Sequence, residues 1–305
     1  MFQIKEDLCE KYYFFLFILI IIPLTLNIMI KKENEIKFDY ISNNFIRVKD
    51  EMGNIKKVNF DDYITCVLAE EMPIYFEIEA LKAQAVAARS YAYNKLNPNS
   101  NYDVVNTVNN QVYKPYDYLK QVWGNNYIQN INKLKRAVIE TNREYIYYEN
   151  EIINAFFFST SSGKTENSKD VFGFEKPYLV SVDSNWDNKS PSYYSESKYA
   201  INDFLNKLNV INYSIKNIKY NKSGSINSMV IGSKLFSGIE LRNLFNLKST
   251  YFEITKDNNY ITIKNKGYGH GVGMSQYGAQ MMAKKGYNYK EIINHYYKNT
   301  EIKKK

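Results

Sequence analysis

The sequence predicts an α+β protein, with mixed helices and antiparallel strands in two lobes around a cleft, preceded by one N-terminal transmembrane helix. Three observations support this: an apolar run near the start, apolar stripes with helical period, and short strand-like segments between polar turns. Strands and helices do not alternate as in βαβ proteins, and no internal repeat is visible. The 305 residues, 45% of them hydrophobic, suffice for one large domain or two small ones.

The apolar run is YYFFLFILIIIPLTLNIMI, residues 12–30, close to the roughly 20 residues that a bilayer requires. No small-residue cleavage site follows it, so we expect an uncleaved anchor rather than a removable signal peptide. Lysines lie on both sides of the run and do not fix its orientation. We therefore expect a tail at 1–11, the membrane helix, a tether at 31–45 and a folded domain at 46–305, with a smaller lobe at about 187–262.

The charge balance and the cysteines restrict the function classes. A net charge of +8 suits an acidic polymer such as nucleic acid, anionic lipid or cell wall, and equally a well-solvated surface with scattered lysines. No nucleic-acid motif accompanies the lysines. Cys9, Cys66, His270 and His295 are too far apart for the usual zinc frameworks. If the run spans a membrane, the two cysteines lie on opposite sides of it and form no disulfide within the chain.

Local patterns predict the remaining elements in chain order. Asn59 or Asp61 caps a helix that Pro73 ends at about Met72. The other expected elements are strands at 45–50 and 55–60 joined as a hairpin, an Ala-rich helix over 76–96, a loop-like stretch from about 99 to 122, a helix over 131–142, two strands within 144–161, a helix over 197–208, a helix capped by Ser275 that ends before Gly286, and a last helix with a capping box from Asn288 to Glu291.

Two adjacent glutamates in the stretch LAEEMP are not equivalent on a helical wheel. Ile64, Val67, Leu68 and Glu71 share the apolar face, whereas Glu70 lies on the flank. Desolvation on that face and the negative end of the helix dipole both favour a protonated Glu71. A raised pKa is what a general acid needs near neutral pH. The alternative is a structural glutamate held by a buried arginine.

The next helix supplies two cations. Lys82 and Arg89 are seven residues apart and therefore share one face of an otherwise Ala-rich helix. Such a pair suits an anionic or hydroxyl-rich ligand, and it equally suits the solvated side of the helix.

Two further stretches have unusual composition. AFFFSTSSGKTENS, residues 155–168, runs from an apolar strand into a hydroxyl-rich loop whose side chains can hydrogen-bond to a sugar. GYGHGVGMSQYGAQMMAKKG, residues 267–286, has glycines at alternate positions, which allow positive φ or the close approach of a ligand. His270 has a glycine on each side, which leaves its imidazole accessible and favours a site over a purely structural role.

Together these stretches resemble the stage II sporulation protein D family, part of a wider group that includes amidase enhancers. The resemblance rests on EEMPIYFEIEALKAQAVAARSYA, FFSTSSGKTEN, PYLVSVDSNWD and GYGHGVGMSQYGAQMMAKKGYNYKEIINHYY, and it covers about residues 45–305. It implies a peptidoglycan lytic transglycosylase that cleaves the β-1,4 bond between N-acetylmuramic acid and N-acetylglucosamine and leaves a 1,6-anhydro end. Glu71 is then the catalytic acid and base.

The same resemblance implies further residues and partners. The substrate-binding residues it implies are Lys82, Arg89, Ser159, His270, Ser275 and Gln276. Some relatives hold zinc at a C-Q-x-Y stretch, but this chain has Asn110 in place of that cysteine, so we expect no metal and no cofactor.

The implied setting is sporulation. The catalytic domain is extracytoplasmic, on a single-pass protein of the engulfing septal membrane of the mother cell, with stage II sporulation proteins P and M as partners and denuded glycan strands as substrate. The rival expectation is a non-enzymatic, glycan-binding enhancer of a cell-wall amidase, because a fold does not determine activity.

Overall fold

The computed structural model describes residues 33–39, 44–107 and 110–305. The expected transmembrane helix at residues 12–30 lies outside these ranges. Among the described residues, no helix is long and apolar enough to cross a membrane. Residues 37–305 form one compact unit, and every element named below belongs to it. The expectation of an α+β protein is confirmed.

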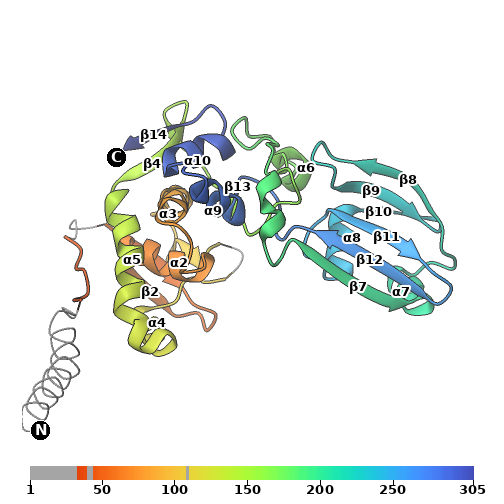
Figure 1. Cartoon of the computed structure of the whole chain (residues 1–305), viewed down its shortest axis with the longest axis horizontal. Helices are drawn as coiled ribbons and strands as arrows, with labels where there is room; N and C mark the ends of the chain where they lie inside the picture. The colour runs from red at the N-terminus through yellow and green to blue at the C-terminus, as the bar shows by residue number, and fades with distance from the viewer. Residues whose placement is uncertain (1–32, 40–43, 108–109) are drawn as a thin grey trace, which may run out of the picture. The chain divides into compact units, whose positions relative to one another are not determined.

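The first hydrophobic core surrounds one Ala-rich helix, α3 (Ile78–Tyr93). Around it pack α2 (Phe60–Glu71), α5 (Tyr127–Glu140), α9 (Gln276–Lys284) and α10 (Tyr289–Tyr296) (Figure 1). The small alanine side chains let these neighbours approach α3 closely on several sides, which explains why nearly the whole helix is buried. Segments from both ends of the folded unit therefore meet at α3.

Short strands complete this part of the molecule. The expected hairpin is confirmed as β1 (Phe45–Lys49) and β2 (Ile55–Asn59), and β3 (Val104–Val105) pairs in parallel with β1. A second small sheet has the order β14-β4-β5. Its strands are β4 (Glu144–Tyr148), β5 (Glu151–Ile152) and β14 (Glu301–Lys304). The last pair, β6 (Phe157–Phe158) with β13 (Met274–Ser275), is parallel and joins two sequence stretches more than 100 residues apart.

One expectation for this region was wrong. The stretch from about 99 to 122 was expected to be loop-like, but it contains the helix α4 (Tyr116–Trp123). Pro115 precedes the helix, Leu119 is buried, and the hydroxyl of Tyr116 donates to Asp62 of α2. The helix is short and mostly exposed, so its stability comes from packing against α2 and α5 rather than from its own sequence.

A second hydrophobic core lies between residues 199 and 263 and is separate from the first. Two three-stranded antiparallel sheets enclose it, with the orders β11-β12-β7 and β10-β9-β8 (Figure 1). The elements are β7 (Tyr194–Ala200), α7 (Ile201–Leu208), β8 (Ile215–Tyr220), β9 (Ile226–Ile231), β10 (Lys234–Ser237), α8 (Gly238–Leu244), β11 (Phe252–Lys256) and β12 (Tyr260–Lys266). The helix expected over 197–208 begins only at Ile201, because residues 197–200 continue the strand β7.

The capped helix ends follow the sequence signals closely. The side chain of Asn59 accepts from the Asp61 amide at the start of α2, and α2 ends at Glu71 with Met72 as its C-cap before Pro73. Ser275 caps α9, and Asn288 with Glu291 forms a capping box on α10. The remaining short elements are α6 (Ser168–Phe172) and the 3-10 turns Gly124–Asn126 and Asn185–Lys189. These caps are local interactions, which is why the sequence alone predicts them.

Candidate active site

Glu71 is the last residue of α2 and completes the buried stripe of that helix. Ile64, Val67 and Leu68 are fully buried, Glu71 is half-buried and Glu70 is exposed, as the helical wheel predicts. Glu71 reaches a pocket of about 380 Å³. The lining residues are Ala69, Glu70, Glu71, Met72, Pro73, Ile74, Trp123, Ser159, Ser192, Gln276 and Tyr277. The polar member of the stripe is thus the one that meets an open cavity.

Two hydrogen bonds hold the carboxyl group of Glu71. Its Oε1 accepts from the Val112 amide at 3.2 Å, and its Oε2 accepts from Nε2 of Gln276 at 3.4 Å. Burial raises the pKa of Glu71, the two hydrogen bonds oppose this, and the charge of Glu70 raises the pKa further. Neither hydrogen-bond partner is a cation. The alternative of a glutamate held by a buried arginine is therefore not what the structure contains.

The wall opposite α2 comes from the two stretches with unusual composition. Parallel pairing of β6 with β13 places Ser159 next to the start of α9, where the Tyr277 amide donates to the Ser159 carbonyl at 3.0 Å. This pairing brings Ser159 and Gln276 into the same pocket as Glu71. The expectation that these two residues line the cleft of Glu71 agrees with their position.

Aromatic side chains in the pocket wall were not anticipated. Trp123 ends α4, and Tyr277 lies in the first turn of α9 with its hydroxyl 3.3 Å from that of Tyr75. The ring of Tyr277 meets Phe76 edge-on at 5.0 Å. Faces of such rings commonly support sugar rings, because the apolar C–H groups of a sugar pack against the aromatic face. Trp123 is one of only two tryptophans in the chain, a signal that could have drawn attention to it.

A buried carboxyl group anchors the back of this wall. Asp187 is inaccessible to solvent and accepts hydrogen bonds from the Ser161 amide and from the hydroxyls of Ser184 and Ser275. Burial raises the pKa of Asp187 to about 6, although these donors and the Gly278 amide oppose the change. Ser275 is therefore committed to Asp187 and to capping α9. It was expected to line the cleft, but it lies behind the pocket and is not among its lining residues.

The two cations of α3 do not meet Glu71. Lys82 forms ion pairs with Glu79 at 2.7 Å and with Glu140 at 2.5 Å. Arg89 is fully buried and donates to main-chain carbonyls, including those of Val138 and Glu144. They share one helix face, as their spacing predicts, but that face packs against the end of α5. Neither lines the Glu71 pocket, so the structure does not bring these two cations together with Glu71.

His270 also lies outside the Glu71 pocket. Its ring packs among Phe156, Phe158 and Phe172, and its Nδ1 accepts from the Val272 amide at 3.0 Å. Burial lowers the pKa of His270 to about 4, so the ring is neutral near pH 7. It lines a separate narrow cavity that includes Glu166. The expected glycine geometry around it is confirmed, since the four alternating glycines all have positive φ.

The position considered for a metal ligand has another role here. The side chain of Asn110 accepts from the Val105 amide and donates to the Tyr91 hydroxyl. Within the described residues, no group of three His, Cys, Asp or Glu side chains could hold a metal ion. Cys66 is buried, and burial raises the pKa of its thiol well above the ordinary range.

The pocket therefore defines a class of site: one desolvated carboxyl group, able to donate and accept a proton, in a cavity lined by hydroxyl, amide and aromatic side chains. Such a site suits acid–base chemistry on a sugar. Residues 48–148 match the family model described as "Stage II sporulation protein".

Curated relatives extend that match over most of the chain. Stage II sporulation protein D of Bacillus amyloliquefaciens is 39% identical over 82% of this chain and 75% of its own length. The protein of the same name from Bacillus subtilis (strain 168) is 38% identical over 82% of this chain and 76% of its own length. The chain belongs to the stage II sporulation protein D family, a family of sporulation proteins. The amidase enhancer of Bacillus subtilis is more distant, 29% identical over 77% of this chain and 39% of its own length.

Proposed function

We propose that the chain is a membrane-anchored peptidoglycan lytic transglycosylase that cleaves the β-1,4 bond between N-acetylmuramic acid and N-acetylglucosamine. The observation that carries the proposal is Glu71, a half-buried carboxyl group with a raised pKa that faces a pocket suited to a sugar. Membership of the family supports it. Sporulation is the setting that the family indicates.

A single carboxyl group suffices for this reaction. Protonated Glu71 donates its proton to the glycosidic oxygen as the bond to the anomeric carbon breaks. The 6-hydroxyl of the same N-acetylmuramic acid then attacks the anomeric carbon and gives its proton back to the Glu71 carboxylate. The products are a free 4-hydroxyl and a 1,6-anhydro ring, with no water consumed. Because the substrate supplies the nucleophile, the second carboxylate of an ordinary glycosidase is not required.

The pocket walls fit the remaining tasks. Gln276 orients the carboxyl group of Glu71 through its hydrogen bond, and Ser159 and Ser192 offer hydroxyls for a sugar. Trp123 and Tyr277 offer ring surface for the apolar faces of the saccharide. Glu70 lines the same pocket from the exposed flank of α2, so Glu70→Gln is a matched control for the loss of a carboxyl group there.

The proposal includes a location and partners. A membrane anchor at residues 12–30 would keep the folded unit outside the cytoplasm, next to the engulfing septum of the mother cell. Sporulation proteins P and M would act on the same wall, and removal of stem peptides would supply the denuded strands. Lys82 and Arg89 have no proposed contact with substrate, because Lys82 pairs with Glu79 and Glu140 and Arg89 donates to main-chain carbonyls, all outside the Glu71 pocket.

The likeness to the amidase enhancer supports a second candidate. In that case the pocket binds glycan without cleaving it, and the chain stimulates a wall amidase. The two candidates differ in one product. Only the transglycosylase generates 1,6-anhydro ends from a strand that carries no stem peptides.

The test is to incubate the full-length protein with denuded glycan strands and to analyse the products by mass spectrometry. We expect 1,6-anhydro ends from the wild type and from Glu70→Gln, and none from Glu71→Gln. Absence of anhydro products from the wild type, together with amidase stimulation that Glu71→Gln leaves intact, favours the second candidate. Release of reducing ends without anhydro sugar would refute both.

A further inference from the structure

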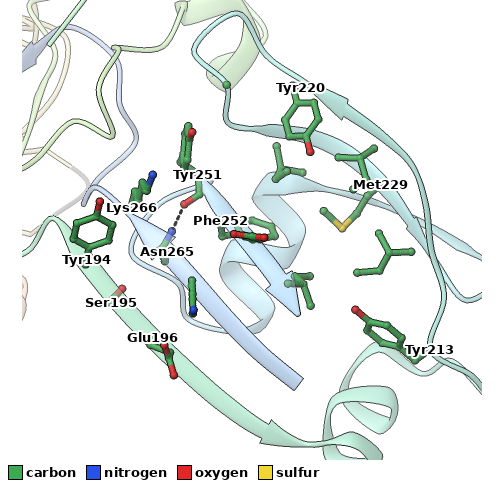
Figure 2. Close-up of a pocket in the computed structure, with 17 residues that line it drawn as sticks. Tyr194, Ser195, Glu196, Tyr213, Tyr220, Met229, Tyr251, Phe252, Asn265 and Lys266 are labelled. Atoms are coloured by element: carbon green, nitrogen blue, oxygen red, sulfur yellow. Dashed lines mark hydrogen bonds between the residues drawn. The ribbon is translucent and has the colours of Figure 1, made fainter. Parts of the chain in front are cut away.

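A groove larger than the Glu71 pocket lies elsewhere in the folded unit. It has a volume of about 850 Å³ and lies between the β7–β12–β11 sheet and the strands β8 and β9 (Figure 2). It shares no lining residue with the Glu71 pocket. Tyr194, Tyr213, Tyr220 and Tyr251 are among the side chains that line it. The proposed reaction uses none of them.

One end of this groove holds a cation between two aromatic rings. The Nζ of Lys266 lies 5.7 Å from the ring centre of Tyr194 and 5.5 Å from that of Tyr251 (Figure 2). The side chain of Tyr194 is 66% exposed. Within the described part of the chain, no ion pair involves Lys266. We call Tyr194, Lys266 and Tyr251 the Tyr–Lys–Tyr cluster; its cation has no carboxylate partner of its own.

The cluster is held in place by its surroundings. Tyr194 and Lys266 are direct partners across β7 and β12. The ring of Tyr193 meets that of Tyr194 at 4.6 Å and nearly at a right angle. Nδ2 of the buried Asn265 donates to the Tyr251 carbonyl at 2.7 Å. These contacts fix the backbone of the cluster and one side of the Tyr194 ring, which reduces the conformational entropy lost when a ligand binds.

The groove and the Glu71 pocket approach each other along the chain. Ser192 lines the Glu71 pocket and Tyr194 lines the groove, so their Cα atoms are at most about 7.6 Å apart along the chain. The connection is fixed, because the Ser192 amide donates to the Ser190 hydroxyl and the Gly267 amide donates to the Tyr193 carbonyl. The Tyr–Lys–Tyr cluster is therefore close to the Ser192 side of the Glu71 pocket.

The segment that contains this groove carries most of the net charge of the chain, although the groove lining itself has two lysines, Lys264 and Lys266, and two glutamates, Glu196 and Glu253. Residues 190–266 contain 11 Lys and Arg residues against 5 Asp and Glu residues, a net +6 out of the +8 of the whole chain. Lys264 lines the groove as well, but Glu196 and Glu253 are its direct neighbours across the sheet. Lys266 is therefore the cation best placed to pair with an anionic group on a ligand.

We propose that this groove is a second binding site for the glycan strand, which holds the part of the strand that extends beyond the Glu71 pocket. Tyr194 and Tyr251 stack against sugar rings, and Lys266 pairs with the lactyl carboxylate that each N-acetylmuramic acid of a denuded strand carries. The inference rests on the glycan substrate proposed above, but it does not depend on cleavage. It predicts that affinity increases with strand length.

The chemistry of the groove favours a saccharide over a peptide. Exposed tyrosine faces next to a cation match the alternation of apolar ring faces and carboxylates along the strand. The strand must also pass beyond the Glu71 pocket in order to be cut internally, and Tyr194 of the groove lies two residues from Ser192 of that pocket. A peptide partner that pairs with the edge strands β8 and β11 is the competing occupant, and the experiment distinguishes it.

The experiment measures binding in the full-length Glu71→Gln protein, so that no strand is cleaved and the result is independent of the reaction. Labelled denuded strands are compared with a short tetrasaccharide of the same sugars. We expect Tyr194→Ala combined with Lys266→Gln to weaken long-strand binding about tenfold. We expect the advantage of long strands over the tetrasaccharide to fall by the same factor. A GlcNAc-only strand of equal length, which has no carboxylate, should respond to Tyr194→Ala but not to Lys266→Gln.

The same sheet supplies a matched control. Lys198 lies over the ring of Tyr260 at 4.3 Å, but neither residue lines the groove. The pair Lys198→Gln with Tyr260→Ala removes the same groups and should change strand binding less than about twofold. Equal losses in both pairs would indicate general charge attraction and overturn the proposal. Long-strand binding unchanged by the first pair would also overturn it, and would leave the groove to a peptide partner.

Discussion

Glu71 and Asp187 are both buried carboxyl groups near the same pocket, yet their surroundings differ. Glu71 accepts two long hydrogen bonds, at 3.2 and 3.4 Å, and opens onto a cavity. Asp187 is inaccessible to solvent and accepts from several donors, including a hydroxyl at 2.6 Å and an amide at 2.9 Å. Burial raises the pKa of both. A raised pKa alone therefore does not identify an acid that acts on substrate.

The difference shows how a carboxyl group that acts on a ligand can be distinguished from one that holds the fold together. A carboxyl group with few partners and an open side can exchange its proton with a ligand, whereas one surrounded by donors holds chain segments together. Asp187 joins the Ser161 loop to the cap of α9 through Ser275, and so it positions Ser159 and Gln276. Glu71 is the group that the resulting wall faces.

The largest expected effect is the loss of strand cleavage when the carboxyl group of Glu71 is removed. Glu71→Gln should lower kcat/KM for strand cleavage by roughly 10² to 10⁴, because it removes the proton donor. Its stability at neutral pH should not fall. Burial raises the pKa of Glu71, so the folded state binds that proton more tightly, and the stabilisation is lost as pH rises through the folded pKa. Kinetics and thermal melts on the same samples test this; lost cleavage together with a lost fold would contradict it.

The second effect concerns stability. Asp187→Asn should lower the free energy of unfolding by about 1–3 kcal/mol, because an amide NH₂ would face donors. Burial raises the pKa of Asp187 to about 6, so its stabilisation is fully present below the unfolded-state pKa and is lost as pH rises through about 6. The deficit of the variant should therefore widen as pH falls. Urea unfolding at about pH 8 and about pH 5 measures it.

A surface aspartate supplies the control for that experiment. The side chain of Asp183 is 70% exposed, so Asp183→Asn should change stability by less than about 0.5 kcal/mol at either pH. If Asp187→Asn behaved like Asp183→Asn, the structural role assigned to the Asp187 network would be wrong.

A smaller effect concerns the pKa of Glu71 and its hydrogen bond from Gln276. The hydrogen bond from Gln276 lowers the pKa of Glu71, so Gln276→Ala should raise that pKa. Because a general acid must be protonated, the alkaline limb of the pH–rate profile should move to higher pH. Ser192→Ala also alters the pocket wall but removes no bond to Glu71, and its profile should keep the wild-type limbs. An identical shift in both variants would argue against this hydrogen bond as the cause.

The smallest effect is expected at Lys82. Lys82→Ala removes ion pairs with Glu79 and Glu140 near the protein surface, which should cost between 0 and about 1 kcal/mol of stability. Its kcat/KM should stay within about twofold of the wild type. A tenfold loss of kcat/KM with unchanged stability would restore Lys82 to the substrate site that the family resemblance implies.

Local signals explain what could be predicted. The stripe of α2, its Asn59 cap and its end before Pro73 depend on residues within a few positions of one another. Ser275 and Asn288 cap their helices for the same reason. These interactions form wherever the backbone turns, so the sequence reveals them without knowledge of the rest of the fold. The distinction between Glu70 and Glu71 follows from the same local geometry.

Long-range packing explains which features could not be predicted from the sequence. The helix α4 is stabilised by its contact with α2 and α5, and its own residues signalled a loop. Arg89 looked like a ligand cation, but its partners are carbonyls of α5 and β4 about 50 residues away in sequence. His270 looked accessible between its glycines, yet phenylalanines from other segments surround it.

The sequence by itself determined the α+β class, the helix ends and the identity of Glu71 as the polar member of an apolar stripe. Each of these depends on chemistry within one element. Only the tertiary structure decided which side chains share a cavity with Glu71. The parallel pairing of β6 with β13 brings Ser159 and Gln276 to the pocket, while ion pairs and main-chain carbonyls keep Lys82 and Arg89 elsewhere. Pocket membership is set by contacts between distant segments, and no local pattern encodes them.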